Sequence, residues 1–478
     1  MILYGLCLLF IFGFSLSQWQ LTRLARAARR RPAPAEPVPG EWPRVTVQLP
    51  VYNELNVVER VIDAAAALDY PAGQLHIQVL DDSTDESVAL AAARVAYHQS
   101  RGLRLSHVRR PSRQGYKAGA LQHGLQATDG ELIAIFDADF VPAPDFLRRT
   151  VPHFADETVG VVQTRWGHLN EADSLLTRLQ AFGLNAHFLV EQVGRSHGGH
   201  FLNFNGTGGV WRRRCIEEAG GWQADTLTED LDLSYRAQLR GWRFVYLPQV
   251  LAPAELPARM DALRSQQFRW TKGAAETARK HLGRVLCDPQ LPLATKAHAA
   301  FHLLNSTVFV AILLMTLLSV PLVLLESRNP ALKPLFRLAS VFLLGLVPLV
   351  FFYHAAWRWN GGRRGAPLGF AAQFGLFLAL SMGLALHNSR AVLLGLLGRA
   401  SEFVRTPKLG GGGRRPRRYR SGGLGWLTVG EALLFGYALL GIGLALRSGS
   451  YGLLPLHLLL ALGYGAVVFF SLLHARRP

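Results

Sequence analysis

The pattern of apolar and polar positions changes twice along the chain. Residues 2–19 form an uncharged apolar stretch of about the length that crosses a bilayer. Between residues 45 and 290, short apolar runs alternate with segments whose apolar residues recur at helical spacing. After residue 300 the chain becomes a series of long apolar runs. The pattern therefore predicts a folded domain inserted between membrane helices.

The central part is expected to be an α/β domain. Four runs are predicted to be strands: 45–52, 76–82, 131–139 and 160–166. Three segments have the spacing of helices: 57–68, 87–97 and 145–154. Alternating strands and helices predict a mainly parallel sheet covered by helices. Ligands bind beyond the carboxyl ends of such strands, and two of the predicted strands end in aspartates.

The remaining apolar runs divide into spanning and interfacial segments. Five are predicted to span the membrane: 2–19, 301–325, 338–357, 427–446 and 451–473. The run 368–398 is interrupted by His387, Asn388 and Arg390, and we expect it to lie along the membrane surface. A basic, proline-rich linker is predicted at 20–44, and a basic segment at 399–422.

The basic residues fix the expected topology. With 368–398 at the interface, the arginines at 23–31, those of 358–364, those of 399–420 and the tail all remain in the cytosol, as the positive-inside rule requires. The amino terminus is then outside and the central domain is cytosolic, in a bacterial inner membrane or a Golgi-type membrane. The alternative for 2–19 is a cleaved signal peptide, whose positive charges would precede the apolar run instead of following it.

The composition supports a membrane protein. Hydrophobic residues make up 50% of the 478 residues, charged residues 18%, and the formal net charge is +18. Because the arginines cluster beside apolar runs, they indicate contact with membrane lipids and no nucleic-acid surface. The three cysteines have neither the number nor the spacing of a disulfide framework or a zinc site.

Acidic residues at two strand ends are candidates for a nucleotide site. Asp81 and Asp82 begin the segment DDSTD, which either binds a base or ribose or simply caps the following helix. Asp137 and Asp139 in DAD either bind a divalent cation, which prefers oxygen ligands, or form a solvated acidic turn. Lys117 in GYKAGAL lies at a predicted helix start, where it either meets phosphate or is an ordinary surface lysine.

Two further segments carry candidate catalytic groups. Glu229 and Asp230 in TED precede a predicted helix, and a carboxylate there either serves as a general base or only caps the helix. Gln266, Arg269 and Trp270 lie within about one helical turn. Indole rings stack on sugars and guanidinium groups bind diphosphate. The alternative is the end of an amphipathic helix near the membrane.

Taken in order, DDSTD, DAD, TED and QxxRW, followed by membrane helices, resemble the processive family-2 glycosyltransferases, such as cellulose, chitin and hyaluronan synthases. The chain is most similar to cellulose-synthase-like glucomannan or mannan synthases and xyloglucan-backbone glucan synthases. Strings that carry the resemblance include VQLPVYNE, IQVLDDSTDES, GYKAGAL, AIFDADFVPAPDFLRR, FNGTGGVWRR and QQFRWTKG. It covers residues 45–290 and, more thinly, 386–408.

The resemblance implies a fold and a set of roles. It implies a Rossmann-like GT-A domain for 45–290, with Tyr52, Glu54, Asp82 and, less directly, Asp81 at the nucleoside. Lys117 and the DAD pair would hold the diphosphate and a Mg²⁺ or Mn²⁺ ion, with Asp139 as the more direct metal ligand and Asp137 beside it.

The acceptor side follows from the same resemblance. Asp230, in TED with Glu229, would be the catalytic base. Trp270 would stack on the acceptor sugar, with Gln266 in the same motif, and Arg269 would balance the diphosphate charge. The segment 403–408 is similar to a gating loop, with Phe403, Thr406 and Lys408 over the donor. Arg405 stands where valine is expected, which leaves the role of that position open.

The implied function is an inverting β-glycosyltransferase that extends a glucan or mannan from UDP-glucose or GDP-mannose and secretes it. The alternative among enzymes is a transferase that adds one sugar to a lipid acceptor, as ceramide glucosyltransferase-like proteins do. A third hypothesis is a non-catalytic membrane subunit or export channel. The presence of every acidic motif, Lys117 and QxxRW argues against it. Accessory export subunits and homo-oligomers are left open by the sequence.

Overall fold

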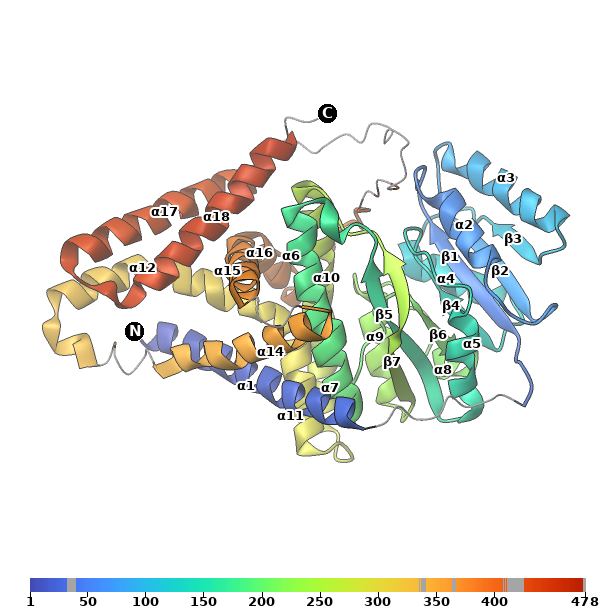
Figure 1. The fold of residues 1–478 in the computed structure, drawn as a ribbon, viewed down its shortest axis with the longest axis horizontal. Helices are drawn as coiled ribbons and strands as arrows, with labels where there is room; N and C mark the ends of the chain where they lie inside the picture. The colour runs from blue at the N-terminus through green and yellow to red at the C-terminus, as the bar shows by residue number, and fades with distance from the viewer. Residues whose placement is uncertain are drawn as a thin grey trace.

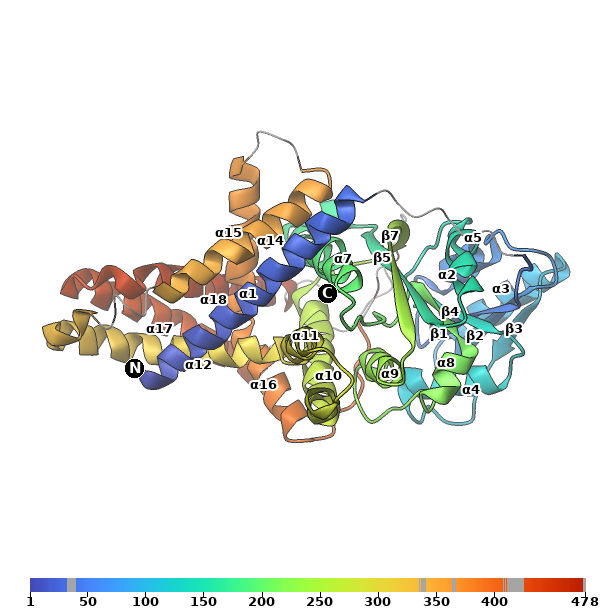
Figure 2. The ribbon, with the colours of Figure 1, turned by 90° about the horizontal axis from the view of Figure 1, so that it is seen from below.

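The computed structural model describes residues 1–31, 40–334, 336, 341–362, 367–406, 408, 410 and 425–475. An α/β domain lies at one side of the molecule and a group of long helices extends away from it (Figure 1). The view from below shows α1 and the orange and red helices at the end opposite to the sheet (Figure 2). This arrangement confirms the expected fold class, an α/β domain joined to an α-helical bundle.

The sheet of the α/β domain has seven strands in the order β3-β2-β1-β4-β6-β5-β7. Its strands are β1 (Val45–Val51), β2 (Leu75–Asp81), β3 (Leu105–Val108), β4 (Leu132–Ile135), β5 (Val159–His168), β6 (Gly209–Arg212) and β7 (Arg243–Ala254). Strand β6 runs antiparallel to its neighbours, and the other pairs are parallel. The carboxyl ends of the parallel strands therefore meet at one edge of the sheet.

The four strands expected from the sequence are confirmed as β1, β2, β4 and β5, although β4 ends four residues before the expected boundary at residue 139. Three strands were not expected. Strand β3 is short, β6 has only four residues, and β7 contains Pro248 and Pro253. Proline removes a ladder hydrogen bond and is tolerated at a sheet edge, which is where β7 lies.

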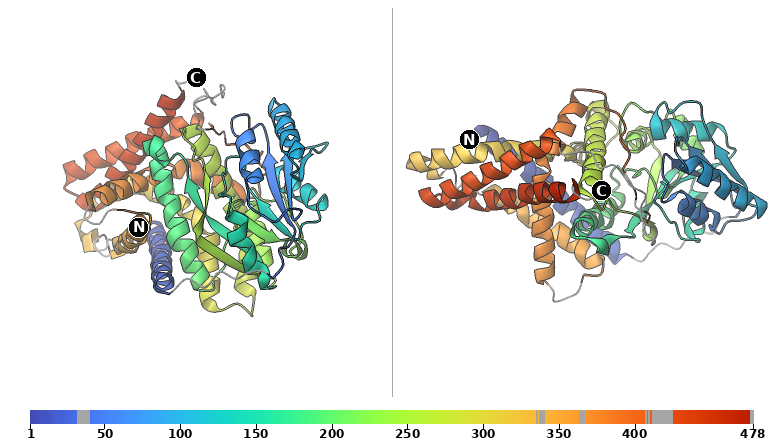
Figure 3. Two further views of the ribbon diagram at one scale, coloured as in Figure 1. Left: turned by 45° about the vertical axis from the view of Figure 1, so that its right-hand side comes forward. Right: turned by 90° about the horizontal axis from the view of Figure 1, so that it is seen from above.

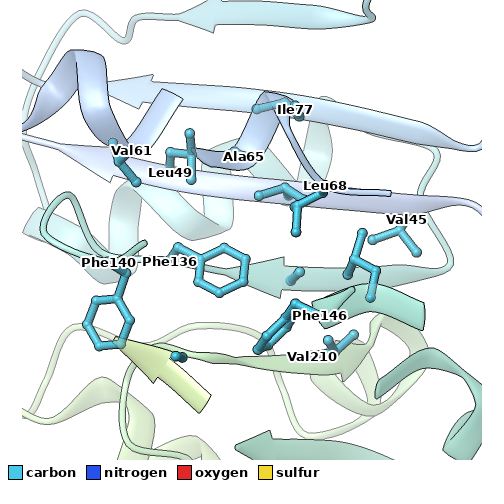
Figure 4. Packing of buried hydrophobic residues seen from close by; sticks show 14 of the residues in the cluster. Val45, Leu49, Val61, Ala65, Leu68, Ile77, Phe136, Phe140, Phe146 and Val210 are labelled. Atoms are coloured by element: carbon cyan, nitrogen blue, oxygen red, sulfur yellow. The ribbon is translucent and has the colours of Figure 1, made fainter. Parts of the chain in front are cut away.

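Helices cover both faces of the sheet. Those of the domain are α2 (Val58–Ala66), α3 (Ser87–Ser100), α4 (Tyr116–Gln126), α5 (Phe146–Thr150), α8 (Arg213–Glu218) and α9 (Glu229–Gln238). In β4, Leu132 and Ala134 enter one core cluster, while Ile133 and Ile135 enter the other. This alternation is the two-residue period of a strand that is buried on both faces. Figure 4 shows the first cluster, in which Val61 and Ala65 of α2 lie over Leu49 and Phe136.

Several helices join the domain to the apolar bundle. They are α6 (Leu175–Ala186), α7 (Gln192–His197), α10 (Met260–Cys287), α11 (Leu293–Leu303) and α14 (Leu346–Trp359). The core on the second face of the sheet includes Phe352 of α14 and Ala25 of α1 (Ile2–Arg30). A single hydrophobic core therefore connects the sheet with two helices of the apolar part.

Among the described residues, four helices are long and apolar enough to cross a membrane: Ile2–Arg30, Asn305–Arg328, Trp426–Ser448 and Tyr451–Ala475. They contain α1, α12 (Val308–Arg328), α17 (Trp426–Ser448) and α18 (Leu454–Ala475). Figure 3 shows the red helices α17 and α18 extending from the α/β domain. Helix α1 continues eleven residues beyond the expected anchor at 2–19, because LTRLARAARR contains no proline or glycine to end it.

The two remaining apolar runs have more complex structures. Of the expected span 338–357, residues 341–345 form a 3₁₀ turn and α14 begins at Leu346, while 338–340 lie outside the described residues. The expected interfacial run 368–398 forms α15 (Pro367–Gly383) and α16 (Ala385–Leu396). These two helices are bent by 52° at their junction. This bend is compatible with a broken span or a re-entrant loop, so the interfacial position stays a prediction.

Candidate active site

A cavity of about 190 Å³ lies at the edge of the sheet where the parallel strands end. Its walls come from the ends of β1, β2, β4, β5 and β7, from α4, α9 and α10, and from the segment 403–408. Every candidate residue from the sequence lines it except Asp81: Tyr52, Glu54, Asp82, Lys117, Asp137, Asp139, Glu229, Asp230, Gln266, Arg269, Trp270, Phe403, Thr406 and Lys408.

Asp81 differs from the expectation. Its side chain accepts hydrogen bonds from the backbone N–H of Ser83 at 2.8 Å and from His107 at 2.8 Å, and the residue is 1% exposed. Ser83 in turn accepts the N–H of Asn53, which has a positive φ of 55°. Asp81 therefore supports the turns that follow β1 and β2 and does not line the cavity, and the nucleoside role expected for it stays a prediction.

The neighbouring Asp82 does face the cavity. Arg110 donates to both of its carboxylate oxygens, at 2.7 and 2.6 Å, and also to the carbonyl of Tyr116 at 2.7 Å. Such a bidentate contact fixes the carboxylate in one orientation. At the same end of the cavity the guanidinium of Arg113 lies 3.4 Å from the ring centre of Tyr52.

The two carboxylates of DAD are each paired with a lysine. Lys117 Nζ is 2.6 Å from Asp137 and donates to the carbonyl of Gly206 at 2.9 Å. Lys408 Nζ is 2.6 Å from Asp139, whose pKa is raised by burial. One lysine belongs to α4 of the domain and the other to the segment 403–408, so the two acids are balanced from different parts of the chain.

Glu229 and Asp230 form the first turn of α9. Burial and the charge of Glu229 raise the pKa of Asp230 to about 7, against the opposing effect of Lys117. A carboxyl group with a pKa near neutrality is well suited to accept a proton at physiological pH. Glu229 itself lies 3.8 Å from Lys117, which connects this turn to the DAD pair through one ammonium group.

Helix α10 holds the TED turn in place. Glu276 accepts the N–H of Leu227 at 2.8 Å and pairs with Lys272 at 2.7 Å. A Cβ atom at Gly273 would lie 2.5 Å from the side chain of Thr228. The absence of a side chain at residue 273 therefore lets α10 approach the backbone that carries Glu229 and Asp230.

The same helix supplies the QxxRW residues. Arg269 donates to the carbonyl of Val404 at 2.8 Å and to Thr406 Oγ1 at 2.9 Å. The rings of Trp270 and Trp166 have centres 6.4 Å apart. Two indole rings at one end of the cavity form an apolar platform of the kind on which sugar rings stack.

Four residues of the segment 403–408 complete the lining of the cavity: Phe403, Arg405, Thr406 and Lys408. Phe403 stacks on Tyr116 with ring centres 5.6 Å apart, and the guanidinium of Arg269 lies 4.7 Å from the Phe403 ring. Arg405 pairs with Glu54 at 2.8 Å, and burial raises the pKa of Glu54 to about 7. The sequence had left the role of Arg405 open, and its partner lies about 350 residues away in the chain.

Three cavity residues were missed in the sequence. Trp166 ends the strand-like string QTRW, and Arg113 lies four positions before Lys117, so both had a local signal. Glu255, which follows β7, had none. It pairs with Arg60 at 2.7 Å and accepts the N–H of Gly410 at 3.1 Å.

The DAD residues can contribute two carboxylates to a divalent cation. Among the described residues there is no group of three or more His, Cys, Asp or Glu side chains that could hold a metal ion. Mg²⁺ and similar ions commonly use one or two carboxylates and complete their coordination with substrate phosphate oxygens and water. Asp137 and Asp139 therefore fit a metal that binds together with a diphosphate, once the lysine contact of Asp139 is exchanged.

The seven-stranded mixed sheet, with paired acids at the edge where its parallel strands end, has the GT-A fold of glycosyltransferases. The sequence comparisons agree with this class. The model of "Glycosyltransferase like family 2" matches residues 43–273. The chain belongs to this family of glycosyltransferases, because two relatives that are 36% identical to it are covered over more than two thirds of their length.

Two relatives and one solved structure illustrate the likeness. The chain is 36% identical over 412 residues to glucomannan 4-beta-mannosyltransferase 1 of Oryza sativa subsp. japonica, covering 80% of this chain and 74% of that protein. It is 36% identical to glucomannan 4-beta-mannosyltransferase 2 of Arabidopsis thaliana, covering 78% and 68%. The fold resembles mannosyltransferase PcManGT from Pyrobaculum calidifontis in complex with GDP-Man and Mn²⁺, with a TM-score of 0.54, 21% identity and coverage of 83% and 100%.

Proposed function

We propose that this protein is a membrane-embedded, inverting β-glycosyltransferase that transfers mannosyl units from GDP-mannose to a growing β-mannan. The observation that carries the proposal is the position of Asp230, which lines one cavity together with the DAD pair and with Trp270. Its two relatives named above are mannosyltransferases, and this supports mannose over glucose as the transferred sugar.

The donor end of the cavity is suited to a nucleoside diphosphate. Tyr52 and Asp82 offer a ring and a fixed carboxylate for the base and ribose. Lys117 and Arg269 offer two cations for the diphosphate. Asp139 and Asp137 would hold Mn²⁺ or Mg²⁺, and that ion would neutralise part of the charge of the leaving diphosphate.

The acceptor end is suited to an attack by a sugar hydroxyl. Trp270 and Trp166 would stack on the terminal sugar of the acceptor, with Gln266 beside them. Asp230 takes the proton of the attacking hydroxyl while the new bond forms at the anomeric carbon and the bond to the diphosphate breaks. A single displacement of this kind inverts the anomeric configuration, so an α-linked donor gives a β-linked product.

The segment 403–408 would act as a gate. The cavity of about 190 Å³ is smaller than the roughly 300–1,000 Å³ of typical ligand pockets. Donor binding therefore requires Lys408 and Arg405 to leave Asp139 and Glu54. Closure over the bound donor would exclude water and limit hydrolysis of the activated sugar.

The reaction is tested with the purified full-length protein in lipid vesicles with Mn²⁺ or Mg²⁺. Labelled GDP-mannose, UDP-glucose and GDP-glucose are offered separately, with short β-mannan oligosaccharides as acceptors. We expect incorporation from GDP-mannose into a product that endo-β-mannanase degrades. Incorporation from UDP-glucose alone would contradict the donor assignment, and a product of one sugar on a lipid would favour the single-addition alternative.

The cytosolic position of the catalytic domain is part of the same proposal. The five-span topology puts the amino terminus outside and the segment around Ser401 inside. The arginines at 414–420, on which this side assignment partly depends, lie outside the described residues. A single cysteine at Ser401, in a background without native cysteines, should react with a membrane-impermeant reagent only from the cytosolic side. Labelling from the outside would contradict the topology.

A further inference from the structure

Helix α17 carries one acidic residue near the start of an otherwise apolar span. Between Trp426 and Leu446, Glu431 is the only charged residue. Its side chain is fully buried and contacts the guanidinium of Arg264 on α10. Arg264 also donates to Thr428 Oγ1 at 3.2 Å, so it binds two positions on the same face of α17.

This ion pair is poorly explained by stability alone. Glu431 Oε1 and Arg264 Nε are buried and have no hydrogen-bond partner in the structure. A buried ion pair is weak evidence for stability, since a well-packed apolar pair of similar volume is often as stable or more so. Ionisable groups inside membrane segments usually have a function.

Helix α16 also contacts α10 at Arg264. His387 Nε2 of α16 donates to the carbonyl of Arg264 at 3.0 Å, and the His387 ring meets Phe268 edge-on at 6.0 Å. Arg390 of α16 lies between Phe268 and Trp426, at 5.8 and 5.7 Å from their ring centres. The first turns of α10 are thus fixed to both α16 and α17.

The next turn of α10 forms the active site. Gln266 lies two residues after Arg264, and Arg269 and Trp270 follow within two turns. Because a helix is stiff over this distance, the place where Arg264 is held sets the depth of Trp270 in the cavity. A misplacement of about 1 Å in a positioned group can reduce a rate by about 10²-fold.

We propose that Arg264 and Glu431 are a positioning pair that couples membrane helix α17 to the QxxRW turn and sets the acceptor platform of the active site. The proposal rests on the proposed function, because it assigns Trp270 to the acceptor. Arg264 and Glu431 do not line the cavity, so they act through α10 and not on the substrate.

The test replaces the charge and keeps the shape. Glu431→Gln, made in the full-length protein in vesicles, should lower kcat about 10- to 100-fold and raise the KM for the oligosaccharide acceptor. The dissociation constant of GDP should stay within twofold, because the proposed nucleoside residues Tyr52 and Asp82 follow β1 and β2 and are not carried by α10. Glu431→Asp, which restores the charge, should recover part of kcat. Glu218→Gln, which breaks an exposed ion pair with Arg214, is the matched control and should leave all three constants unchanged.

Three results would overturn the proposal. They are a wild-type kcat in Glu431→Gln with only a lowered unfolding temperature, a parallel loss of GDP binding and turnover, or no recovery in Glu431→Asp. Where Glu431→Gln does not accumulate, Arg264→Lys replaces it. A lysine keeps the charge but is shorter and lacks the planar fork of the guanidinium, so it does not reproduce the geometry in which Arg264 binds Thr428 and Glu431. We therefore expect kcat to fall about tenfold, and an unchanged kcat contradicts the pair. The kcat and KM of each variant are compared with those of the wild type on the donor that the wild type uses. An error in the donor assignment would therefore appear in the wild-type assay and would not affect this comparison.

Discussion

The active site is built from two regions that balance its acids in different ways. On the α/β domain, Arg110 and Lys117 lie in or next to helix α4 and bind Asp82 and Asp137. On the segment 403–408, which follows the apolar helix α16, Arg405 and Lys408 bind Glu54 and Asp139.

The position of each cation in the fold suggests which cations stay in place and which are exchanged when the donor and its metal ion bind. Lys117 lies on helix α4, whereas Lys408 lies outside any helix or strand. We therefore expect Lys117 to remain when the diphosphate binds and Lys408 to give up its contact with Asp139 to a metal ion. We infer that the domain performs the chemistry and that the segment 403–408 controls access. Substitutions in the two regions should therefore have effects of different size and kind.

The largest effect is expected within the domain, at Asp230. Asp230→Asn should reduce transfer about 10²- to 10⁴-fold, because the acceptor hydroxyl loses its base. Binding of GDP should remain within a few-fold of wild type, as measured by calorimetry. Asp225→Asn, which removes an exposed carboxylate from the ion pair with Lys280, is the control. Near-normal turnover by Asp230→Asn would show that another group takes the proton.

Asp139 belongs to the domain but is paired with Lys408 of the segment 403–408. The second-largest loss of transfer is expected when Asp139 or its metal ion is removed. Removing the divalent cation with EDTA, or changing Asp139 to Ala, should reduce transfer about 10²- to 10³-fold, since metal stabilisation of a leaving group contributes several kcal/mol. Added Mn²⁺ should restore the EDTA-treated wild type and leave the variant inactive. Full activity in EDTA would mean that Lys117, Arg269 and the backbone neutralise the diphosphate.

A smaller and different effect is expected at Lys408. In the proposed closed gate Lys408 donates to the bound diphosphate, and loss of a hydrogen bond to a charged group costs about 1.5–3 kcal/mol, which corresponds to about 10- to 100-fold in rate. Lys408→Ala should slow transfer by this amount and raise the ratio of donor hydrolysis to transfer, because the gate no longer excludes water. Lys296→Ala, on α11 and outside the cavity, should change neither quantity. An unchanged hydrolysis ratio in Lys408→Ala would remove the gating role.

The smallest effect is the change in kcat/KM over a single pH unit, and it again concerns a residue of the domain, Asp230. Asp230 acts as a base only when it is deprotonated, and its pKa is raised to about 7. The ratio kcat/KM should therefore fall about tenfold per pH unit below pH 7 and level off above it. Asp230→Asn should lose this inflection while retaining a low, flat residual rate. A wild-type profile without change between pH 5 and 8 would contradict the assigned pKa.

The comparison also shows what a sequence can predict. Asp82, Asp139 and Asp230 lie in short motifs at the ends of strands or at the start of a helix, and Trp270 lies in a motif inside α10. The sequence predicts that all four belong to one site, and all four line the same cavity. Asp81 does not line the cavity, because neighbouring residues of a strand point in opposite directions, and only the structure shows that His107 and Ser83 bind it.

Long-range contacts lay beyond the sequence pattern. The partner of Arg405 is Glu54, at the far end of the chain, and no local signal connects them. Strand β7 was hidden by its prolines, and the anchor at 2–19 was expected to end eleven residues before α1 does, because charge was taken as its boundary. The pair of Arg264 and Glu431 likewise appears only when α10 and α17 are brought together.

The most direct test of the central claim is the stereochemistry of a single transfer. GDP-α-mannose and a short acceptor are incubated with the wild-type protein, and the anomeric protons of the new linkage are followed by NMR before any secondary reaction. One displacement assisted by Asp230 predicts a β-linked mannosyl product from the first turnover. An α-linked product would require two displacements and a nucleophile in the cavity, and it would contradict the role of Asp230 as the base.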